Sequence, residues 1–168
     1  MFNPIRIPTA IAGAAAAVLF ATAAQAGSSN ANLGVSATVN GSCTISTSPL
    51  AFGTVDTLSA SPVLGTGGLS VACTNGSAWT ASAGVGAGSG ATFAARRMTS
   101  GANTLNYQIY TDSGRTTLWG DGTLSTSTIG GTGTGSTQAV TVYGRIPAGQ
   151  TATPAGTYAD TVAVTVTY

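Results

Sequence analysis

Few side chains in this 168-residue chain could carry out chemistry. The sequence contains no His, Lys or Glu, which excludes a Ser-His or Cys-His relay, a Schiff-base lysine and a phosphate-loop lysine. Paired aspartates can act as acid and base, but none of the four aspartates lies in a recognisable catalytic motif. We therefore expect no enzyme activity and no catalytic, cofactor-binding or metal-binding residue. The aspartates are Asp56, Asp112, Asp121 and Asp160.

The two cysteines, Cys43 and Cys73, are the remaining reactive side chains. In an oxidising compartment a single disulfide between them is the simplest prediction. Closing a loop of this size stabilises a fold by about 3 to 4 kcal/mol in the chain-entropy model. Two buried free thiols are the alternative. A metal site is disfavoured because two cysteines without any histidine provide too few ligands.

Residues 1–26 have the features of a secretory signal peptide in the usual order. Arg6 is the only cation, an alanine-rich apolar run follows, and Ala24-Gln25-Ala26 is a small-x-small cleavage site. A membrane anchor is the alternative, but the apolar run is short for a span of about 20 residues. We therefore expect export, a mature chain of residues 27–168 and no membrane span after cleavage.

Charge is sparse and balanced in this mature chain, which contains four arginines and four aspartates. Without a cluster of basic residues, binding to nucleic acid through a basic face is excluded. A nearly neutral surface of Ser, Thr, Gly and Ala gives little repulsion between copies, which favours a place inside an assembly. The same composition is also typical of a secreted β-protein with many turns.

The last residues of the sequence predict a half-buried β-strand. Val162, Val164, Val166 and Tyr168 alternate with smaller or polar residues, so their side chains point to one face of an extended chain. No turn and no further strand follow, so one edge of this strand is expected to be bare. A bare apolar strand edge tends to pair with another strand, from the same chain or from a neighbour.

A second alternating segment lies near the mature N-terminus. Leu33, Val35, Ala37 and Val39 occupy every second position, as in a one-sided strand. Asn40-Gly41 follows, which is the strongest short-range signal for a β-hairpin, so the segment could fold back on its own chain. The same dipeptide could instead be the swivel of an arm that leaves the domain.

Between these two segments, short alternating runs and turns recur at regular intervals without a helical period, which predicts an all-β sandwich. A Ser-, Pro- and Gly-rich stretch up to Gly68 and a Ser-, Thr- and Gly-rich stretch over 124–137 are expected to be loops. Arg96-Arg97 is interpreted as a solvated pair. Trp119 and Tyr107 are expected to pack in the core, although a carbohydrate-binding sandwich would use such aromatic residues.

Several blocks together resemble the spore coat protein U family, which includes pilin subunits of archaic chaperone-usher pili in Gram-negative bacteria. The likeness extends over essentially the whole mature chain and in the same order. The blocks are Ser42-Cys43-Thr44, Leu50-Ala51-Phe52-Gly53, Val71-Ala72-Cys73-Thr74, Leu105-Asn106-Tyr107-Gln108-Ile109-Tyr110-Thr111-Asp112, Arg115-Thr116, Leu118-Trp119-Gly120-Asp121-Gly122, Val142-Tyr143-Gly144-Arg145-Ile146-Pro147 and Pro154-Ala155-Gly156-Thr157-Tyr158-Ala159-Asp160-Thr161-Val162.

The resemblance implies an incomplete immunoglobulin-like sandwich over 41–168 that is completed by a donated strand, with residues 27–40 as the donor arm. A periplasmic chaperone, an outer-membrane usher and identical or related pilin subunits would be its partners. The expected product is an extracellular pilus for surface adhesion and biofilm formation, and a mature chain of one domain favours a shaft or adaptor subunit. A self-complemented secreted or coat protein is the alternative.

Overall fold

The computed structural model describes residues 24–168, and in this range it contains eight β-strands and no helix. Most of the predicted signal peptide, residues 1–23, lies outside the described residues. The chain divides into an N-terminal unit that ends at Ala37 and a compact unit from Thr38 to Tyr168. The strands are β1 (Cys43–Ala51), β2 (Val63–Cys73), β3 (Ala78–Ala83), β4 (Arg96–Ser100), β5 (Asn103–Tyr110), β6 (Ile129–Thr132), β7 (Thr137–Ile146) and β8 (Val164–Thr167).

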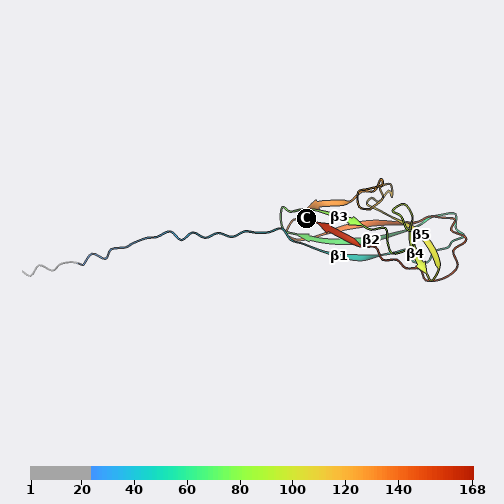
Figure 1. Ribbon diagram of the computed structural model, residues 1–168, viewed down its shortest axis with the longest axis horizontal. Helices are drawn as coiled ribbons and strands as arrows, with labels where there is room; N and C mark the ends of the chain where they lie inside the picture. The colour runs from blue at the N-terminus through green and yellow to red at the C-terminus, as the bar shows by residue number, and fades with distance from the viewer. Residues whose placement is uncertain (1–23) are drawn as a thin grey trace, which may run out of the picture. The chain divides into compact units, whose positions relative to one another are not determined.

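The strands of the compact unit form two antiparallel sheets that lie in two layers (Figure 1). The larger sheet has the order β1-β2-β7-β5-β4, and the smaller sheet has the order β6-β3-β8. β2 and β7 form the longest ladder, which runs from the Val63–Ile146 pair to the Ala72–Thr137 pair. The all-β sandwich predicted from the alternating runs is confirmed, and β1 and β8 are each left at an edge of their sheet.

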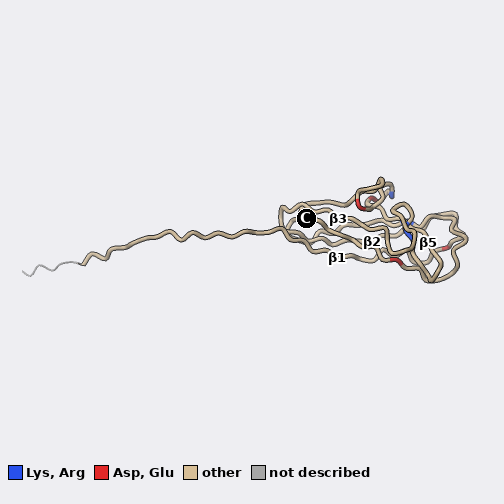
Figure 2. The backbone as a smooth tube through the Cα atoms, in the orientation of Figure 1, with Lys and Arg blue, Asp and Glu red and all other residues tan. Residues whose placement is uncertain are grey.

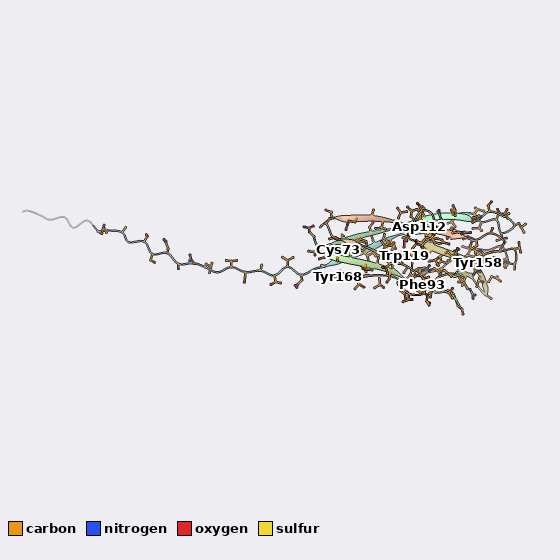
Figure 3. The ribbon with its side chains drawn as sticks, turned by 90° about the horizontal axis from the view of Figure 1, so that it is seen from above. Cys73, Phe93, Asp112, Trp119, Tyr158 and Tyr168 are labelled. Atoms are coloured by element: carbon orange, nitrogen blue, oxygen red, sulfur yellow. A yellow bond between two sulfur atoms is a disulfide. The ribbon has the colours of Figure 1, made fainter. Side chains whose placement is uncertain are left out.

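The core lies between the two sheets and consists of the side chains that alternate along each strand. Trp119 is 2% exposed and lies in the middle of the sandwich, with Cys73 and Tyr168 toward one end and Tyr158 toward the other (Figure 3). Tyr107 is 4% exposed, so the core interpretation of both aromatic residues is confirmed. The other core residues are Leu69, Val71, Cys73, Trp79, Ala81, Ala83, Leu105, Ile109, Val142 and Ile146.

Two local predictions were wrong because pairing between strands overrode local composition. β2 begins at Val63, inside the expected loop, because it pairs along its whole length with β7. β6 forms within the expected loop 124–137, since Gly130 and Gly131 pair with Thr80 and Trp79 of β3. A Cβ atom at position 131 would lie 2.8 Å from the Trp79 ring, so a larger residue would not fit there. Ladder partners of this kind lie far away in the sequence.

Of the two alternatives for Leu33 to Val39, the hairpin is not formed, because residues 24–42 belong to no strand. The side chains of Leu33 and Val35 are 88% and 86% exposed, and that of Val39 is 83% exposed. Ala37 is exposed as well. The apolar alternation in this segment is therefore not explained by a hairpin with the strand that follows it.

Candidate functional site

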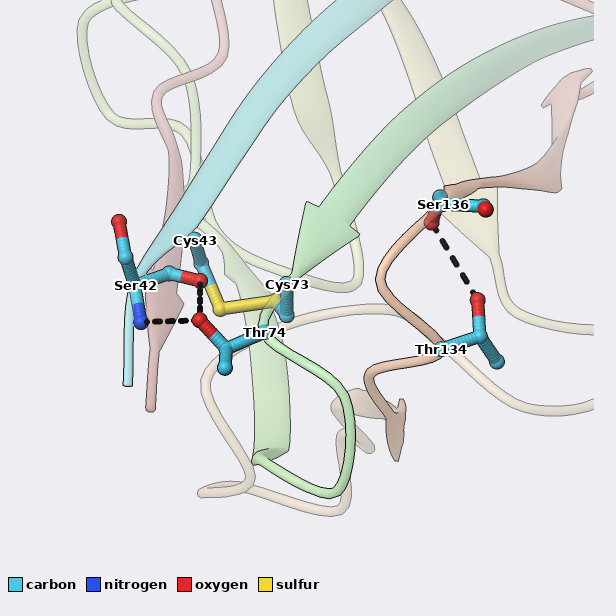
Figure 4. The surroundings of a disulfide bond; sticks show 6 residues. All are labelled: Ser42, Cys43, Cys73, Thr74, Thr134 and Ser136. Atoms are coloured by element: carbon cyan, nitrogen blue, oxygen red, sulfur yellow. Dashed lines mark hydrogen bonds between the residues drawn. A yellow bond between two sulfur atoms is a disulfide. The ribbon is translucent and has the colours of Figure 1, made fainter. Parts of the chain in front are cut away.

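The disulfide at the start of β1 is the first predicted site feature that the structure contains. Cys43 and Cys73 are bonded, 30 positions apart in the sequence, and face each other in the β1–β2 ladder. Beside them, Thr74 Oγ1 accepts a hydrogen bond from the Ser42 amide at 3.0 Å and donates one to the Ser42 carbonyl at 3.3 Å (Figure 4). The predicted disulfide is confirmed, and it fixes one end of the edge strand β1 to its neighbour.

Beyond the disulfide, the inward face of β1 is uncovered. Ile45 and Thr47 pair directly with Val71 and Leu69, and directly paired residues in an antiparallel ladder point to the same side of the sheet. Val71 and Leu69 are 0% and 3% exposed, whereas Ile45 is 36% exposed and Thr47 is also exposed. The core side of this edge therefore lacks a covering layer.

β8 is half covered in the same way on the opposite sheet. Val164 and Val166 pair with Ala83 and Ala81, which are 2% and 0% exposed, so both valines face the core. Both are only half-buried. β8 pairs with β3 alone and β1 pairs with β2 alone, and within 24–168 their outer edges pair with no other strand.

A groove lies between these two edges. Its volume is about 430 Å³, and one wall is formed by 47–50 of β1 while the other is formed by 158–162 and Val164. The floor consists of core side chains from the larger sheet and of Trp119, and half-buried lining residues such as Phe52, Met98 and Val162 leave apolar surface open to solvent. The buried floor residues are Leu69, Tyr107, Ile109, Trp119 and Val142.

A second cavity of about 690 Å³ adjoins the groove at the far end of β1. Both cavities are lined by Leu50, Phe52, Met98 and Tyr158, so these side chains separate the two. The Phe52 ring lies edge-on to that of Tyr107, with 6.2 Å between the ring centroids. We call the first cavity the groove and the second the end cavity.

The predicted acceptor strand contributes to the groove in part. Val162 and Val164 line it, and Val166 packs against the core without lining it. Tyr168 is 61% exposed and is not among the lining residues. The side chains that form the floor come from β2, β5, β7 and Trp119, which a strand-by-strand interpretation of the sequence did not bring together.

The interpretation of Arg96-Arg97 as a solvated pair is wrong for Arg96, because its side chain is fully buried. Its Nε and Nη2 donate to the Gly84 carbonyl at 3.0 and 2.8 Å, and Nη2 also donates to the Trp119 carbonyl at 2.7 Å. Cζ of the Arg96 guanidinium lies over the Phe93 ring, 5.5 Å from the ring centroid. Burial lowers the pKa of Arg96, while Tyr107 and Asp160 partly oppose that shift.

A polar pair, Tyr107 and Asp160, lies in the otherwise apolar lining of the groove. The Tyr107 hydroxyl donates to Asp160 Oδ2 at 2.7 Å. Burial, and then the hydrogen bond to Asp160, raise the pKa of Tyr107 well above its usual range. Asp160 was not singled out from the sequence, although it is the only charged residue among the last eleven. That isolation is the signal that could have found it.

No group of three His, Cys, Asp or Glu side chains that could hold a metal ion occurs among the described residues. The few charged residues lie in the half of the compact unit toward β5, away from the C-terminus (Figure 2). Over 24–168 there is also no helix with the length and apolar character needed to cross a bilayer. The arrangement therefore offers an apolar groove with two unpaired strand edges, which suits the binding of an extended peptide segment.

Comparison with known proteins identifies the family. The model of the Spore Coat Protein U domain matches residues 29–165, which is most of the chain. The chain belongs to the spore coat protein U domain family. A relative in this family, Protein U of Myxococcus xanthus, is 38% identical over 181 residues, with 99% of each chain covered. The resemblance stated from the sequence blocks is therefore confirmed.

The fold of this spore coat protein U domain is also similar to a solved structure. That structure is the CsuC–CsuE chaperone–tip adhesion subunit pre-assembly complex from archaic chaperone-usher Csu pili of Acinetobacter baumannii. The TM-score is 0.55 at 26% sequence identity, and the match covers 78% of this chain. It covers 40% of the matched chain, so the similarity concerns part of that longer protein.

Proposed function

We propose that this protein is a structural subunit of a secreted chaperone-usher pilus and that it polymerises by donor-strand complementation. In this proposal the groove of one subunit receives residues 27–40 of the next, which add a strand between β1 and β8. The single observation that carries the proposal is the groove itself, whose apolar floor is open between two strand edges that lack a neighbour. Strand addition provides main-chain hydrogen bonds for affinity and side-chain pockets for register.

The arm has the pattern that such a groove requires. Leu33, Val35, Ala37 and Val39 would share one face of an extended strand, and all four are exposed. Moving these side chains into the groove would contribute about 4 to 8 kcal/mol from apolar burial. Each ladder hydrogen bond would add about 1 kcal/mol. Together these terms would make a joint between subunits that is difficult to reverse.

The combination of a groove and an arm supports a shaft or adaptor position. A subunit inside a fibre must both receive a strand and donate one, whereas a terminal subunit needs to do only one of these. The proposed route runs through the periplasm, where a chaperone would cover the groove until an outer-membrane usher allows exchange. The proposed location is the cell surface, where the fibre would serve adhesion and biofilm formation.

Deletion of residues 27–39 tests this function. We expect the full chain, produced in an oxidising compartment, to form multimers that survive SDS without boiling. The deletion variant should remain monomeric and should bind a synthetic peptide of residues 27–40 with a stoichiometry of about one. Multimers of normal length from the deletion variant would reject the proposal. A stable soluble monomer from the full chain, with no affinity for the peptide, would favour the self-complemented alternative.

A further inference from the structure

We propose that Asp160 is a positioning residue that holds one wall of the groove in the conformation that accepts a strand. This inference rests on the proposed function and concerns the part of the chain that leads into β8. The carboxylate of Asp160 ties this wall to the floor of the sandwich and to the loop after β3.

The wall segment connects the two sheets. At one end, Ala159 exchanges two backbone hydrogen bonds with Thr99 of β4, at 2.8 and 3.1 Å. At the other end, the Ala163 carbonyl accepts a hydrogen bond from the Gly84 amide, just beyond β3, at 2.9 Å. Residues 160–163 between these points belong to no strand, so the backbone ladder does not fix their course. Side-chain contacts must therefore fix the part of the wall that presents Val162 to the groove.

The Asp160 carboxylate provides three such contacts. Oδ2 accepts a hydrogen bond from the Tyr107 hydroxyl at 2.7 Å, and Oδ1 accepts from the Ala87 amide at 2.8 Å and from the Thr161 amide at 2.7 Å. Tyr107 is a buried residue of β5, whereas Ala87 lies in the loop that follows β3. One carboxylate thus connects the wall to both layers, and hydrogen bonds that involve a charged group are the stronger ones.

The loop around Gly86 is shaped to receive this carboxylate. Gly86 has a φ of +97°, a backbone conformation that L side chains rarely adopt. A Cβ atom at this position would overlap Asp160 Oδ2. The seat for Asp160 therefore depends on a glycine in the facing loop as well as on the tyrosine in the floor.

We call the three hydrogen bonds of the Asp160 carboxylate the clamp, and its expected effect is to keep the groove open. Val162 and Val164 are half-buried beside a cavity of about 430 Å³, and apolar side chains gain free energy by filling such a space. Without the clamp, the wall could move inward and occupy the place of the donor strand. The clamp would then determine how well the groove binds a donor strand, in addition to its effect on the stability of the sandwich.

Affinity for the arm peptide tests this role directly. In the variant that lacks residues 27–39, whose groove is free, Asp160→Asn should weaken the binding of a fluorescent peptide of residues 27–40 at least about tenfold. Tyr107→Phe should also weaken the binding of the peptide. The double variant should bind the peptide as well as Asp160→Asn alone does, because both substitutions remove the same hydrogen bond. Asp121→Asn is the matched control, since Asp121 accepts its hydrogen bonds from Thr123 in a turn that does not line the groove.

Amide hydrogen exchange provides a second measurement that does not depend on the peptide. In Tyr107→Phe, which keeps the ring and its volume, the Gly84 and Thr99 amides should exchange faster, while amides of the β2–β7 ladder keep their protection. A merely structural role would lower the melting temperature and leave the affinity per folded molecule unchanged, and that result would overturn the inference. If the variant that lacks residues 27–39 fails to bind the peptide with Asp160 and Tyr107 intact, the proposed function fails instead, because the clamp can be assessed only on a groove that accepts the arm.

Discussion

Adding even a methyl group to the glycine at position 144 should destabilise the fold, although this glycine lies in a regular strand. Gly144 is buried on the core face of β7 and pairs with Gly65 of β2. A Cβ atom at position 144 would lie 2.6 Å from Cζ of Phe52 and 2.8 Å from Cδ1 of Leu50. At position 65 it would lie 3.0 Å from Cδ1 of the same ring. The two glycines therefore form the seat for the aromatic ring that separates the groove from the end cavity.

The expected change in the free energy of unfolding for Gly144→Ala follows from two opposing effects. Inserting a methyl group into a packed site costs about 1 to 3 kcal/mol, because neighbouring side chains must leave their preferred positions. Replacing Gly by Ala also restricts the unfolded chain, which stabilises the fold by about 0.4 to 1 kcal/mol. We therefore expect Gly144→Ala to lower the free energy of unfolding by about 1 to 2 kcal/mol, or the melting temperature by about 3 to 10 °C for a domain of this size.

The matched control is Gly68→Ala in the neighbouring strand β2. A Cβ atom at position 68 would lie 3.5 Å from the Val140 carbonyl and 3.8 Å from Cβ of Ser48, which are ordinary contacts. Only the unfolded-state term then remains, so Gly68→Ala should be neutral or slightly stabilising. Urea and thermal unfolding with the disulfide intact would measure both variants.

A compensating change makes the test specific to the ring. Phe52→Leu shortens the side chain that meets the new methyl group, so the double variant should be less destabilised than the sum of the two single variants. If Gly144→Ala were as stable as Gly68→Ala, or if Phe52→Leu gave no relief, the interpretation of this seat would be refuted.

Three further predictions concern the arm, the disulfide and acid stability. Val35→Asp should prevent multimers because an unpaired carboxylate is unfavourable in an apolar groove, whereas Ser36→Asp on the opposite face of the arm should leave multimers intact, as judged by SDS-resistant ladders. Replacing Cys43 and Cys73 together with Ser should lower the free energy of unfolding by about 3 to 4 kcal/mol in urea titrations, because the bond closes a loop of 30 positions. Hydrogen bonds from Thr117 and Thr116 hold the pKa of Asp112 below its usual value near 3.8, so this carboxylate stabilises the fold above that pH and the contribution is lost as the pH falls through the lower folded value. Asp112→Asn should therefore reduce the change of the urea midpoint between about pH 2 and pH 5, and an unchanged profile would contradict the assignment.

The sequence predicted those parts of the fold that depend on local alternation. Leu105, Tyr107 and Ile109 form the buried face of β5, and Val142 and Ile146 form that of β7, as a period of two requires. The disulfide could also be predicted, since two cysteines in a chain that is expected to be exported leave few alternative pairings. Features set by distant partners were missed. The buried Arg96 side chain donates hydrogen bonds to the carbonyls of Gly84 and Trp119, and no pattern in the sequence near Arg96 predicts these acceptors.

The candidate site was predictable only as far as its strand edges. The alternating valines near the C-terminus indicated an apolar strand, and Val162 and Val164 do line the groove. The floor could not be assembled from the sequence because it depends on which strands become neighbours, and the order β1-β2-β7-β5-β4 does not follow chain order. The role of Asp160 likewise depends on two contacts that are 53 and 73 positions distant.

The position of the disulfide has a mechanical consequence if subunits are joined through their arms. The arm enters the domain at β1, and Cys43 is the first residue of that strand. A pulling force on the arm would therefore load the hydrogen bonds between Ser42 and Thr74 and then the covalent cross-link, before it reached the hydrogen bonds between β1 and β2 beyond Cys43. β1 could not be unzipped from β2 starting at this end, so the load would pass directly to the long β2–β7 pair. Reducing the Cys43–Cys73 bond should lower the force at which a single domain ruptures in an optical trap.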